Sequence, residues 1–243
     1  MAIQGVFFDL GGTLFSYSGM AKSTGPLLLK AVQQLGVQVS LPDIGRAYRQ
    51  ASAQVGKQYG ALDYYLHADL FRDTFVQFST LLGCAFDPSI YEWYRHAQHE
   101  AVLGALELRA DCRNTLAELR SKGLYLSIVS NIDDDMLHPL IEREQLQDYL
   151  HHWSSSEEAQ SCKPHSAFFE YSLGKSGLAA EDVLFVGDSP EHDVLGASSM
   201  GMKTVLISAE GLEAPLQSGK PTVPADFNIT NLSELLELAD LPP

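Results

Sequence analysis

The stretch FFDLGGTLF, residues 7–15, joins an aromatic apolar run to a Gly-Gly-Thr turn. The whole apolar run spans residues 3–10 and stops at two glycines, which is typical of a short buried strand followed by a tight turn. Asp9 lies where this strand ends, so the pattern predicts a carboxylate presented at the carboxyl end of a strand. We expect the chain to turn helical after Thr13, without pairing a second strand.

A helical block follows this strand. Apolar residues at helical spacing, punctuated by glycines, cover residues 27–36, 44–60, 61–83 and 89–104. No strand pattern interrupts them, so the sequence predicts an all-helical region inserted after the first strand, over residues 17–100. Aromatic side chains are predicted to form the core of this region, a few of them facing a cleft: Tyr64, Tyr65, Phe71, Phe75, Phe78, Tyr91, Trp93 and Tyr94.

Strands and helices alternate along the rest of the chain. Strand patterns cover 124–131, 149–154, 182–189, 204–208 and 227–229, and helical patterns cover 113–123, 134–145, 165–177, 191–201 and a segment from about 232. This alternation predicts an α/β fold, a Rossmann-like parallel sheet with helices on both faces. Residues 1–16 and 101–243 then form the core, and residues 17–100 form an inserted helical cap. The stretch 209–225 is predicted to be a loop.

Composition narrows the classes of partner. The 243 residues include 31 acidic and 16 basic side chains, a formal net charge of −15. Nucleic acids and anionic membranes reward clustered Lys and Arg, so we expect neither as a partner. No apolar run approaches the ~20 residues of a membrane span, and the three cysteines lack zinc-ligand spacing. We therefore expect a cytoplasmic protein with reduced thiols, and both a monomer and a homodimer stay open.

Polar residues follow three of the predicted strands. Asp9, the pair Ser130-Asn131 and Asp188 each stand where a strand ends. Open α/β sheets bind ligands outside the carboxyl ends of their strands. The sequence therefore predicts one polar site at that edge of the sheet.

Two other polar groups are interpreted as structural. The run Asp133–Asp135 precedes a helical pattern, and acidic residues in the first turn of a helix are favoured by the helix dipole. His151 and His152 show no spacing typical of metal ligands. Neither group is predicted to bind a metal.

In their order along the chain, the polar residues resemble the four motifs of the haloacid dehalogenase superfamily, whose members are mostly phosphatases. The matching positions are Asp9 with Gly12 and Thr13, then Ser130-Asn131, then Lys163 in CKPHSAFFE, and GDSPEHD at residues 187–193. The helical block lies where the subgroup with a helical cap (the C1 type) carries its insertion. Each motif is weak by itself, and the four in order at plausible spacing are specific.

The resemblance implies a role for each matching residue. Asp9 is the nucleophile that attacks phosphorus and forms an aspartyl phosphate, while Lys163 and Ser130 assist it. Lys163 is a point positive charge that orients the nucleophile and offsets the charge of the transferring oxygens. The phosphate-binding groups implied are Gly12, Thr13, Ser130, Asn131 and Lys163.

The resemblance also implies Mg²⁺, which prefers oxygen ligands and a few carboxylates. Its ligands would be Asp9, the backbone carbonyl of Gly11 and Asp188. Asp193 either holds Lys163 or reaches the metal, directly or through a metal-bound water. The expected activity is phosphatase action on small phosphorylated metabolites.

Gly11 departs from the family pattern. At this position the family's phosphatases carry a second aspartate, which protonates the leaving alcohol; such an acid/base group is worth about 10²–10⁴ in rate. A good leaving group, a water beside Gly11 or a cap residue could take over this task. For the substrate itself, cap residues near the hinge such as Phe15, Tyr17 and Lys22 are expected to face the reacting group.

Other activities stay open at this point. Dehalogenases of the family need no leaving-group proton, but they lack the carboxylate that Asp188 provides. Phosphonate-cleaving members use a cap lysine, and none of Lys22, Lys30 and Lys57 lies in a recognisable context. A catalytically weakened, binding-only member is a further alternative. The string DLGGTL also matches the phosphate loop of actin-like sugar kinases, yet the chain shows neither an internal duplication nor a second Gly-rich site.

Overall fold

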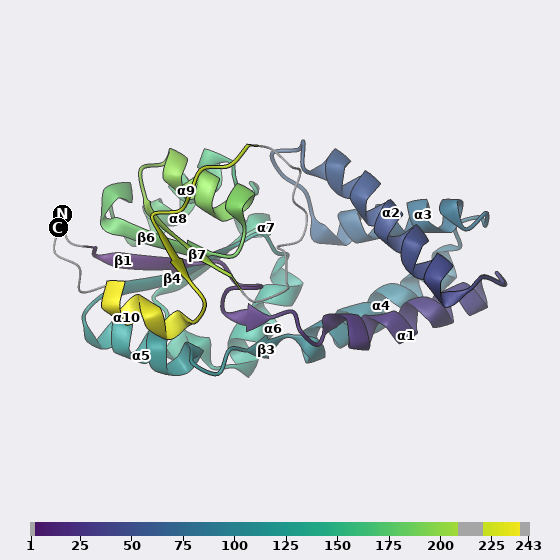
Figure 1. The fold of residues 1–243 in the computed structure, drawn as a ribbon, viewed down its shortest axis with the longest axis horizontal. Coiled ribbons are helices and arrows are strands. Elements are labelled where there is room, and N and C mark those ends of the chain that lie inside the picture. The colour runs from purple at the N-terminus through teal and green to yellow at the C-terminus, as the bar shows by residue number, and fades with distance from the viewer. Residues whose placement is uncertain (1–2, 209–220, 239–243) are drawn as a thin grey trace.

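The computed structural model describes residues 3–208 and 221–238. Its main sheet has six parallel strands in the order β5-β4-β1-β6-β7-β8 (Figure 1). The strands are β1 Gly5–Phe8, β4 Tyr125–Ser130, β5 His152–Ser155, β6 Val183–Gly187, β7 Lys203–Ile207 and β8 Phe227–Ile229. The predicted α/β fold with a parallel sheet is confirmed. Most of the predicted loop, residues 209–220, lies outside the described residues.

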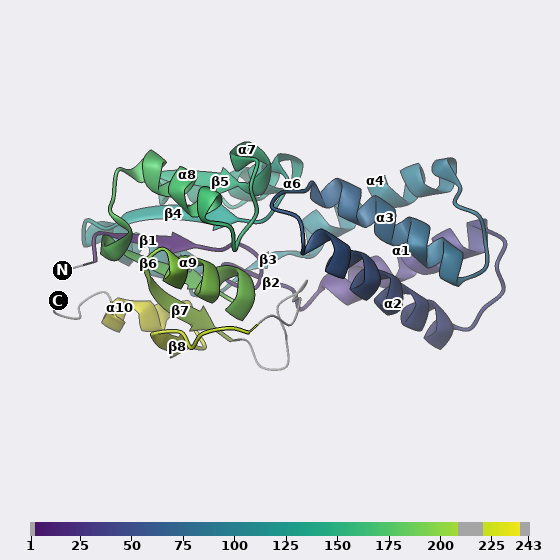
Figure 2. The same ribbon diagram turned by 90° about the horizontal axis from the view of Figure 1, so that it is seen from above.

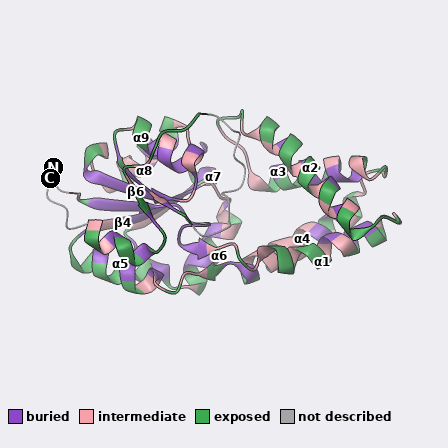
Figure 3. Ribbon diagram, in the orientation of Figure 1, coloured by how far each residue is buried: buried purple, intermediate pink, exposed green. Residues whose placement is uncertain are grey.

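Helices cover both faces of this sheet because successive strand residues point to opposite sides. On one face Val6 and Phe8 pack with Leu116 and Leu137 of the helices α5 and α6. On the other face Phe7 packs with Phe168 of α8. The buried strands run through the middle of the core in Figure 3. The helices of the core are α5 Cys112–Ser121, α6 Asp134–Arg143, α7 Ser156–Ala159, α8 Ser166–Ser176, α9 Gly196–Ser199 and α10 Leu235–Leu238.

Four helices form a separate layer beyond one edge of the sheet (Figure 2). They are α1 Met20–Gln34, α2 Leu41–Tyr59, α3 His67–Leu81 and α4 Pro88–Ala105. α1 packs on α4 and α2 packs on α3. We call this helical layer the cap. Its own apolar cluster includes Phe75, Phe78, Tyr91 and Tyr94, as predicted, whereas Phe71 is 42% exposed and is not part of that cluster.

The chain after Thr13 differs from the sequence-based expectation. It does not turn helical at once: the short strand β2, Phe15–Ser16, pairs antiparallel with β3, Glu107–Leu108, where the chain returns from the cap. The reason is topological, since the outgoing and returning chains must pass side by side to insert a cap. A two-residue strand has too few residues to show a period in the sequence.

Two predicted helices also begin or continue differently. Helix α3 begins at His67, six residues after the predicted start at residue 61. The segment predicted as a helix over 191–201 is a π-helical turn, η3 Pro190–Leu195, followed by α9. Wide turns of this kind are common at functional sites, and here the turn allows Asp193 to reach back toward the sheet.

All three cysteines are free thiols, with Cys112 and Cys162 buried and Cys84 half-buried. Within the described ranges, every helix is too short or too polar to cross a bilayer. The cytoplasmic location stays a prediction.

His152 links β5 to the neighbouring strand β4 and to β1. Its Nδ1 lies 2.8 Å from the Tyr125 hydroxyl and its Nε2 lies 2.7 Å from Ser127 Oγ, while its ring meets Phe7 edge-on. Burial, and then the charge of Lys175, lowers the pKa of His152 to about 4. The residue is therefore structural, in agreement with its interpretation from the sequence.

This histidine is expected to make folding acid-labile. Between pH about 6.5 and about 4 the unfolded chain binds a proton at His152 that the folded protein does not, so the free energy of unfolding falls as the pH falls through that window. His152→Gln should flatten this dependence in urea unfolding measured from pH 7 to pH 4. His138→Gln, on the exposed surface of α6, is the control that should leave it unchanged. Equal slopes for wild type and His152→Gln would contradict the assignment.

Candidate active site

Neighbouring strands bring the sequence-predicted residues to one edge of the sheet. β1 lies between β4 and β6, with Phe8 paired to Ile128 and Val186. Asp9, Ser130 and Asp188 therefore stand together at the carboxyl ends of three adjacent strands. This is the edge beyond which the cap lies (Figure 2). Ligands of open α/β sheets bind at such an edge.

Asp9 is buried and hydrogen-bonded on both carboxylate oxygens. Oδ1 accepts from Ser130 Oγ at 2.9 Å and from Lys163 Nζ at 2.8 Å, and Oδ2 accepts a longer bond from Thr13 Oγ1 at 3.4 Å. The residue is 8% exposed. These contacts fix the orientation of Asp9 before any ligand binds.

Lys163 lies at the centre of this network and is 3% exposed. Its ammonium donates to Asp9 Oδ1 at 2.8 Å, to Asp193 Oδ1 at 2.6 Å and to the Val129 carbonyl at 2.8 Å. These three acceptors satisfy all three N–H donors of a lysine. Burial alone would lower the pKa of Lys163, but the charges of Asp193 and Asp9 raise it above its ordinary value.

Asn131 holds Lys163 in place. Its Oδ1 accepts from the Lys163 backbone N–H at 2.7 Å, and its Nδ2 donates to the Lys163 carbonyl at 3.0 Å. Both polar ends of the amide are thus used on the main chain. Sequence reasoning expected Asn131 to donate to a phosphate; the structure instead places it behind the lysine.

Three carboxylates converge beside the lysine. Asp9, Asp188 and Asp193 each offer an oxygen, and these atoms lie within 4.8 Å of one another. Burial, and then the charges of Asp9 and Asp193, raises the pKa of Asp188 to about 8, against the opposing effect of Lys163. Burial also raises the pKa of Asp193 to about 6, although Lys163 lowers it. One lysine does not balance three carboxylates, so the site is short of positive charge.

Gly12 allows this cluster to form. Its φ is +78°, a region that favours glycine, and a Cβ built there would lie 1.9 Å from Asp188 Oδ2. The backbone of the first motif and the carboxylate of the fourth motif therefore touch. This close approach explains the glycine at residue 12 better than the turn alone.

Gly12→Ala is expected to displace Asp188 and to reduce kcat/KM by about 100-fold, since ångström-scale shifts of reacting groups cost that much. Gly123→Ala is the matched control, because Gly123 has a φ of +83° but open space around its Cβ position. The control should lose only the conformational cost of about 1–2 kcal/mol. Urea unfolding measures the cost of backbone strain in both variants. Steady-state kinetics measure the effect of the clash with Asp188, which only Gly12→Ala makes. Equal effects of the two variants would show that Asp188 does not depend on Gly12.

A small cavity of about 40 Å³ opens beside the cluster. It is lined by Gly12, Ser16, Tyr17, Arg109, Asp188, Ile207 and Ser208. Its volume suits a few waters and is too small for a sugar phosphate.

Arg109 and Tyr17 reach this cavity from the hinge. Arg109 donates to the Gly12 carbonyl at 2.8 Å, and no described residue partners its buried Nε. Sequence reasoning missed Arg109, whose only signal is its place directly after the chain returns from the cap. Of the hinge residues it singled out, Tyr17 lines the cavity, Phe15 is fully buried in the core and Lys22 is exposed. Burial, and then the charge of Asp9, raises the pKa of Tyr17 well above its ordinary value.

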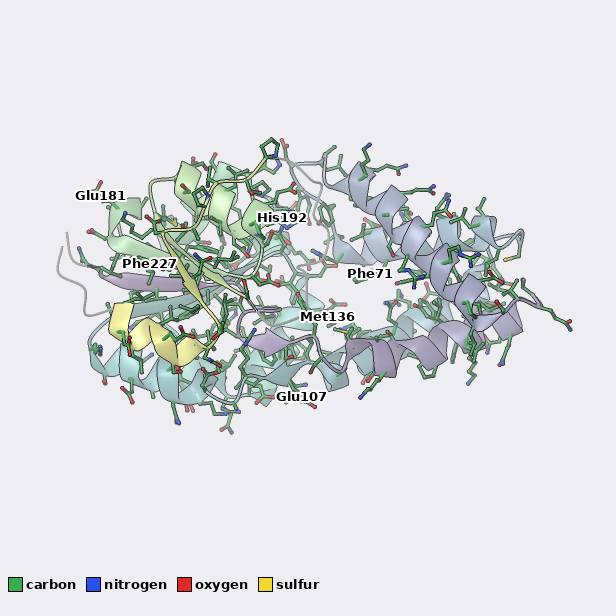
Figure 4. The ribbon with its side chains drawn as sticks, in the orientation of Figure 1. Phe71, Glu107, Met136, Glu181, His192 and Phe227 are labelled. Atoms are coloured by element: carbon green, nitrogen blue, oxygen red, sulfur yellow. The ribbon has the colours of Figure 1, made fainter. Side chains whose placement is uncertain are left out.

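Asp133 connects the core to the cap. Its two carboxylate oxygens accept the backbone N–H groups of His67 and Ala68, each at 2.8 Å, at the start of α3. Asp133 thus caps a helix that is distant in the sequence, which explains why α3 begins at His67. Nearby, the Cys162 N–H donates to the Asp63 carbonyl at 2.8 Å. Figure 4 labels Phe71 of α3 and Met136 of α6 on the two sides of this junction.

Comparison with known proteins agrees with this arrangement. The family model described as haloacid dehalogenase-like hydrolase matches residues 6–207, from β1 to β7. The chain belongs to the haloacid dehalogenase-like hydrolases. The matched range contains every residue of the cluster described above and the whole cap.

A curated relative is the ribulose-1,5-bisphosphate 5-phosphatase of Halopiger xanaduensis. It is 27% identical over 240 residues, which cover 96% of this chain and 98% of the relative. The similarity thus extends over both the core and the cap.

Solved structures share the fold at lower identity. The Bacillus subtilis protein YfnB, solved bound to magnesium, has a TM-score of 0.73 and 18% identity, covering 99% of this chain and all of its own, that is 100%. The L-2-haloacid dehalogenase of Xanthobacter autotrophicus also has a TM-score of 0.73, with 22% identity and coverage of 97% of this chain and 98% of its own. At these identities the likeness concerns the fold alone.

Proposed function

We propose that this hydrolase is a Mg²⁺-dependent phosphatase of small phosphorylated metabolites that works through an aspartyl phosphate on Asp9. The single observation that carries the proposal is the half-buried Asp188 carboxylate beside Asp9. A haloacid substrate needs no second carboxylate there, because halide leaves as a stable anion. A phosphate ester brings two negative charges, which need a cation between the carboxylates and the phosphoryl oxygens.

The residues present fit a divalent cation. The oxygens of Asp9, Asp188 and Asp193 lie within 4.8 Å of one another, and burial together with the charges of the other two carboxylates raises the pKa of Asp188 to about 8. Asp9, Asp188 and the Gly11 carbonyl would hold the ion, with Asp193 bonded to Lys163 and the Ser189 N–H. When bound, Mg²⁺ supplies neutralisation of the phosphoryl charge.

The chain's own residues account for the remaining steps. Asp9 Oδ2, which is free of the strong bonds made by Oδ1, attacks phosphorus and splits the hydrolysis into two displacements. Lys163 holds Asp9 through Oδ1 and contributes positive charge at the reacting centre. Ser130 and Thr13 fix the same carboxylate from either side. Gly11 stands where the resemblance implies a general acid, so the leaving group must obtain its proton from another source.

The similarity to a curated relative supports a substrate class, and the site residues weigh against two alternative reactions. The curated relative acts on a sugar bisphosphate, which supports a small phosphorylated metabolite. Dehalogenation has the likeness of fold to the Xanthobacter autotrophicus enzyme in its favour, but that likeness does not account for Asp188. Phosphonate cleavage would need a lysine of the cap at the site, and Lys22, a cap lysine near the hinge, is exposed.

Product release with and without metal tests the proposal. Phosphate release from an aryl phosphate and a panel of sugar phosphates should require Mg²⁺, fall by more than about 100-fold in EDTA and return when Mg²⁺ is restored. Halide release from a 2-haloacid, measured in parallel, should be absent. Metal-independent halide release would replace the phosphatase with a dehalogenase. Mg²⁺ binding without any product would indicate the binding-only alternative.

A further inference from the structure

The space beside Gly11 is occupied. A Cβ built on Gly11 would lie 2.1 Å from the Tyr17 hydroxyl oxygen, 2.7 Å from Cζ and 3.0 Å from Cε1. No side chain at residue 11 could coexist with the phenol in this position, since Cβ contacts below 3.0 Å are essentially never seen. The Tyr17 phenol therefore fills the volume that a side chain at residue 11 would take.

The hinge holds Tyr17 at this place. Tyr17 directly follows β2, which is paired with β3, and its carbonyl accepts the Met20 N–H at 3.0 Å where α1 begins. Its ring packs against the apolar cluster of the core. Anchored on both sides along the chain, the phenol is positioned by the fold and not by a flexible cap loop.

The Tyr17 hydroxyl points into the site with its donor unused. Tyr17 lines the same cavity as Gly12 and Asp188. Across residues 3–208 and 221–238, no hydrogen bond engages this hydroxyl. A half-buried tyrosine hydroxyl beside three carboxylates normally donates to one of them, so a free donor here is available to a ligand.

From this geometry we infer that the Tyr17 hydroxyl donates a hydrogen bond to the leaving-group oxygen of the substrate, in the place of the carboxylic acid absent at Gly11. The inference rests on the proposed phosphatase activity and concerns how the first displacement is completed. Asp9 forms the new P–O bond, the ester P–O bond breaks with its electron pair going to the leaving oxygen, and that oxygen takes its proton from water. Tyr17 stabilises the developing charge and keeps its own proton.

This donor sets a substrate preference. A phenol, with an ordinary pKa of about 10, is a far weaker acid than a carboxylic acid near 4, so it assists the departure of a basic alkoxide less than a carboxylic acid would. Substrates whose leaving oxygen is stable as an anion are favoured: aryl, enol and acyl phosphates, and the 1-phosphates of sugars. Simple alkyl phosphates depend most on the Tyr17 hydrogen bond.

Tyr17→Phe keeps the ring and removes only the donor. Its kcat/KM should fall by about 10- to 100-fold on alkyl phosphates, the value of one hydrogen bond to a charged group, and by less than about 3-fold on an aryl phosphate with an acidic phenol. kcat/KM is the informative quantity because it reports formation of the aspartyl phosphate. Tyr171→Phe, on the surface of α8, is the matched control and should change neither substrate. Equal losses on both substrates, or no loss, would overturn the inference.

A second pair of variants tests the shared volume without relying on turnover. Gly11→Asp alone should lower the melting temperature because its Cβ meets the phenol. Adding Tyr17→Ala should restore the melting temperature and raise kcat/KM on alkyl phosphates above that of Tyr17→Ala alone. Additive effects of the two substitutions would overturn the shared placement. A wild type that releases no phosphate from any ester would refute the phosphatase, while the melting temperatures still judge the placement of Tyr17.

Discussion

Asp9→Asn is expected to abolish phosphate release, lowering kcat by about 10⁴- to 10⁶-fold, as removal of a catalytic nucleophile does elsewhere. Asparagine keeps the size of the side chain but offers no carboxylate to attack phosphorus. Lys163 would keep its bonds to Asp193 and to the Val129 carbonyl, so the fold should persist. The loss should therefore appear in kinetics and not in the melting temperature.

The same variant tests the covalent intermediate. Wild-type protein quenched in acid during turnover should carry one phosphoryl group on the peptide that contains Asp9, and Asp9→Asn should carry none. Asp148→Asn is a control of the same chemistry on an exposed turn of the core and should retain full activity. Phosphorylation of a different residue, or a variant that keeps a tenth of the activity, would remove Asp9 from its proposed role.

Much of the core of the site could be predicted because its residues stand at strand ends. Asp9, Ser130 and Asp188 follow apolar runs whose type is clear from the sequence, and parallel strands bring such ends to one edge. Lys163 could be placed only through the family resemblance, since a lone Lys-Pro has no local signal. Its partners were anticipated in part: Asp193 does bond to it.

The parts that escaped prediction depend on contacts between distant segments. Tyr17 and Arg109 reach the cavity only because β2 pairs with β3 across the whole cap. Asp133 lies before α6 as an acidic cap would, yet its oxygens bind the start of α3, 65 residues away at Ala68. Local propensity describes what a residue does for its own helix, and it cannot show which other helix terminus comes within reach.

Those distant contacts change how Gly11 is understood. From the sequence alone, Gly11 was interpreted as the absence of an acidic side chain, with space beside it that a water could fill. In the structure the Tyr17 phenol fills that space, so restoring aspartate at residue 11 alone should not restore an acid. The glycine and the tyrosine form one unit, with the small residue making room for the large one.

Lys163→Met is expected to have the second large effect, on stability as well as on activity. The lysine is 3% exposed and is the cation that bonds to both Asp9 and Asp193. Removing one partner of a buried ion pair leaves an uncompensated charge, which costs about 3–5 kcal/mol. Phosphate release should fall by about 10³-fold or more, because the positive charge at the reacting centre is lost.

The pH dependence of this loss identifies its electrostatic origin. Even beside Lys163 the pKa of Asp193 is raised to about 6, so the stability that its protonated form provides is lost as the pH rises through that value. Without the lysine the carboxylates repel one another more, and the stability lost in Lys163→Met should be larger at pH 8 than at pH 5. Mg²⁺ should recover part of it at pH 8, since the ion replaces the missing positive charge.

Lys175→Met is the matched control for the same substitution in a solvated ion pair. Lys175 Nζ lies 2.7 Å from Glu158, but its side chain is 29% exposed, and exposed pairs contribute about 0–1 kcal/mol. Urea unfolding of both variants at pH 5 and pH 8 compares two lysine–carboxylate contacts of similar length and different burial. Because only the buried lysine neutralises a cluster, a pH-independent loss in Lys163→Met equal to that in Lys175→Met would mean that packing, and not charge, explains the position of Lys163.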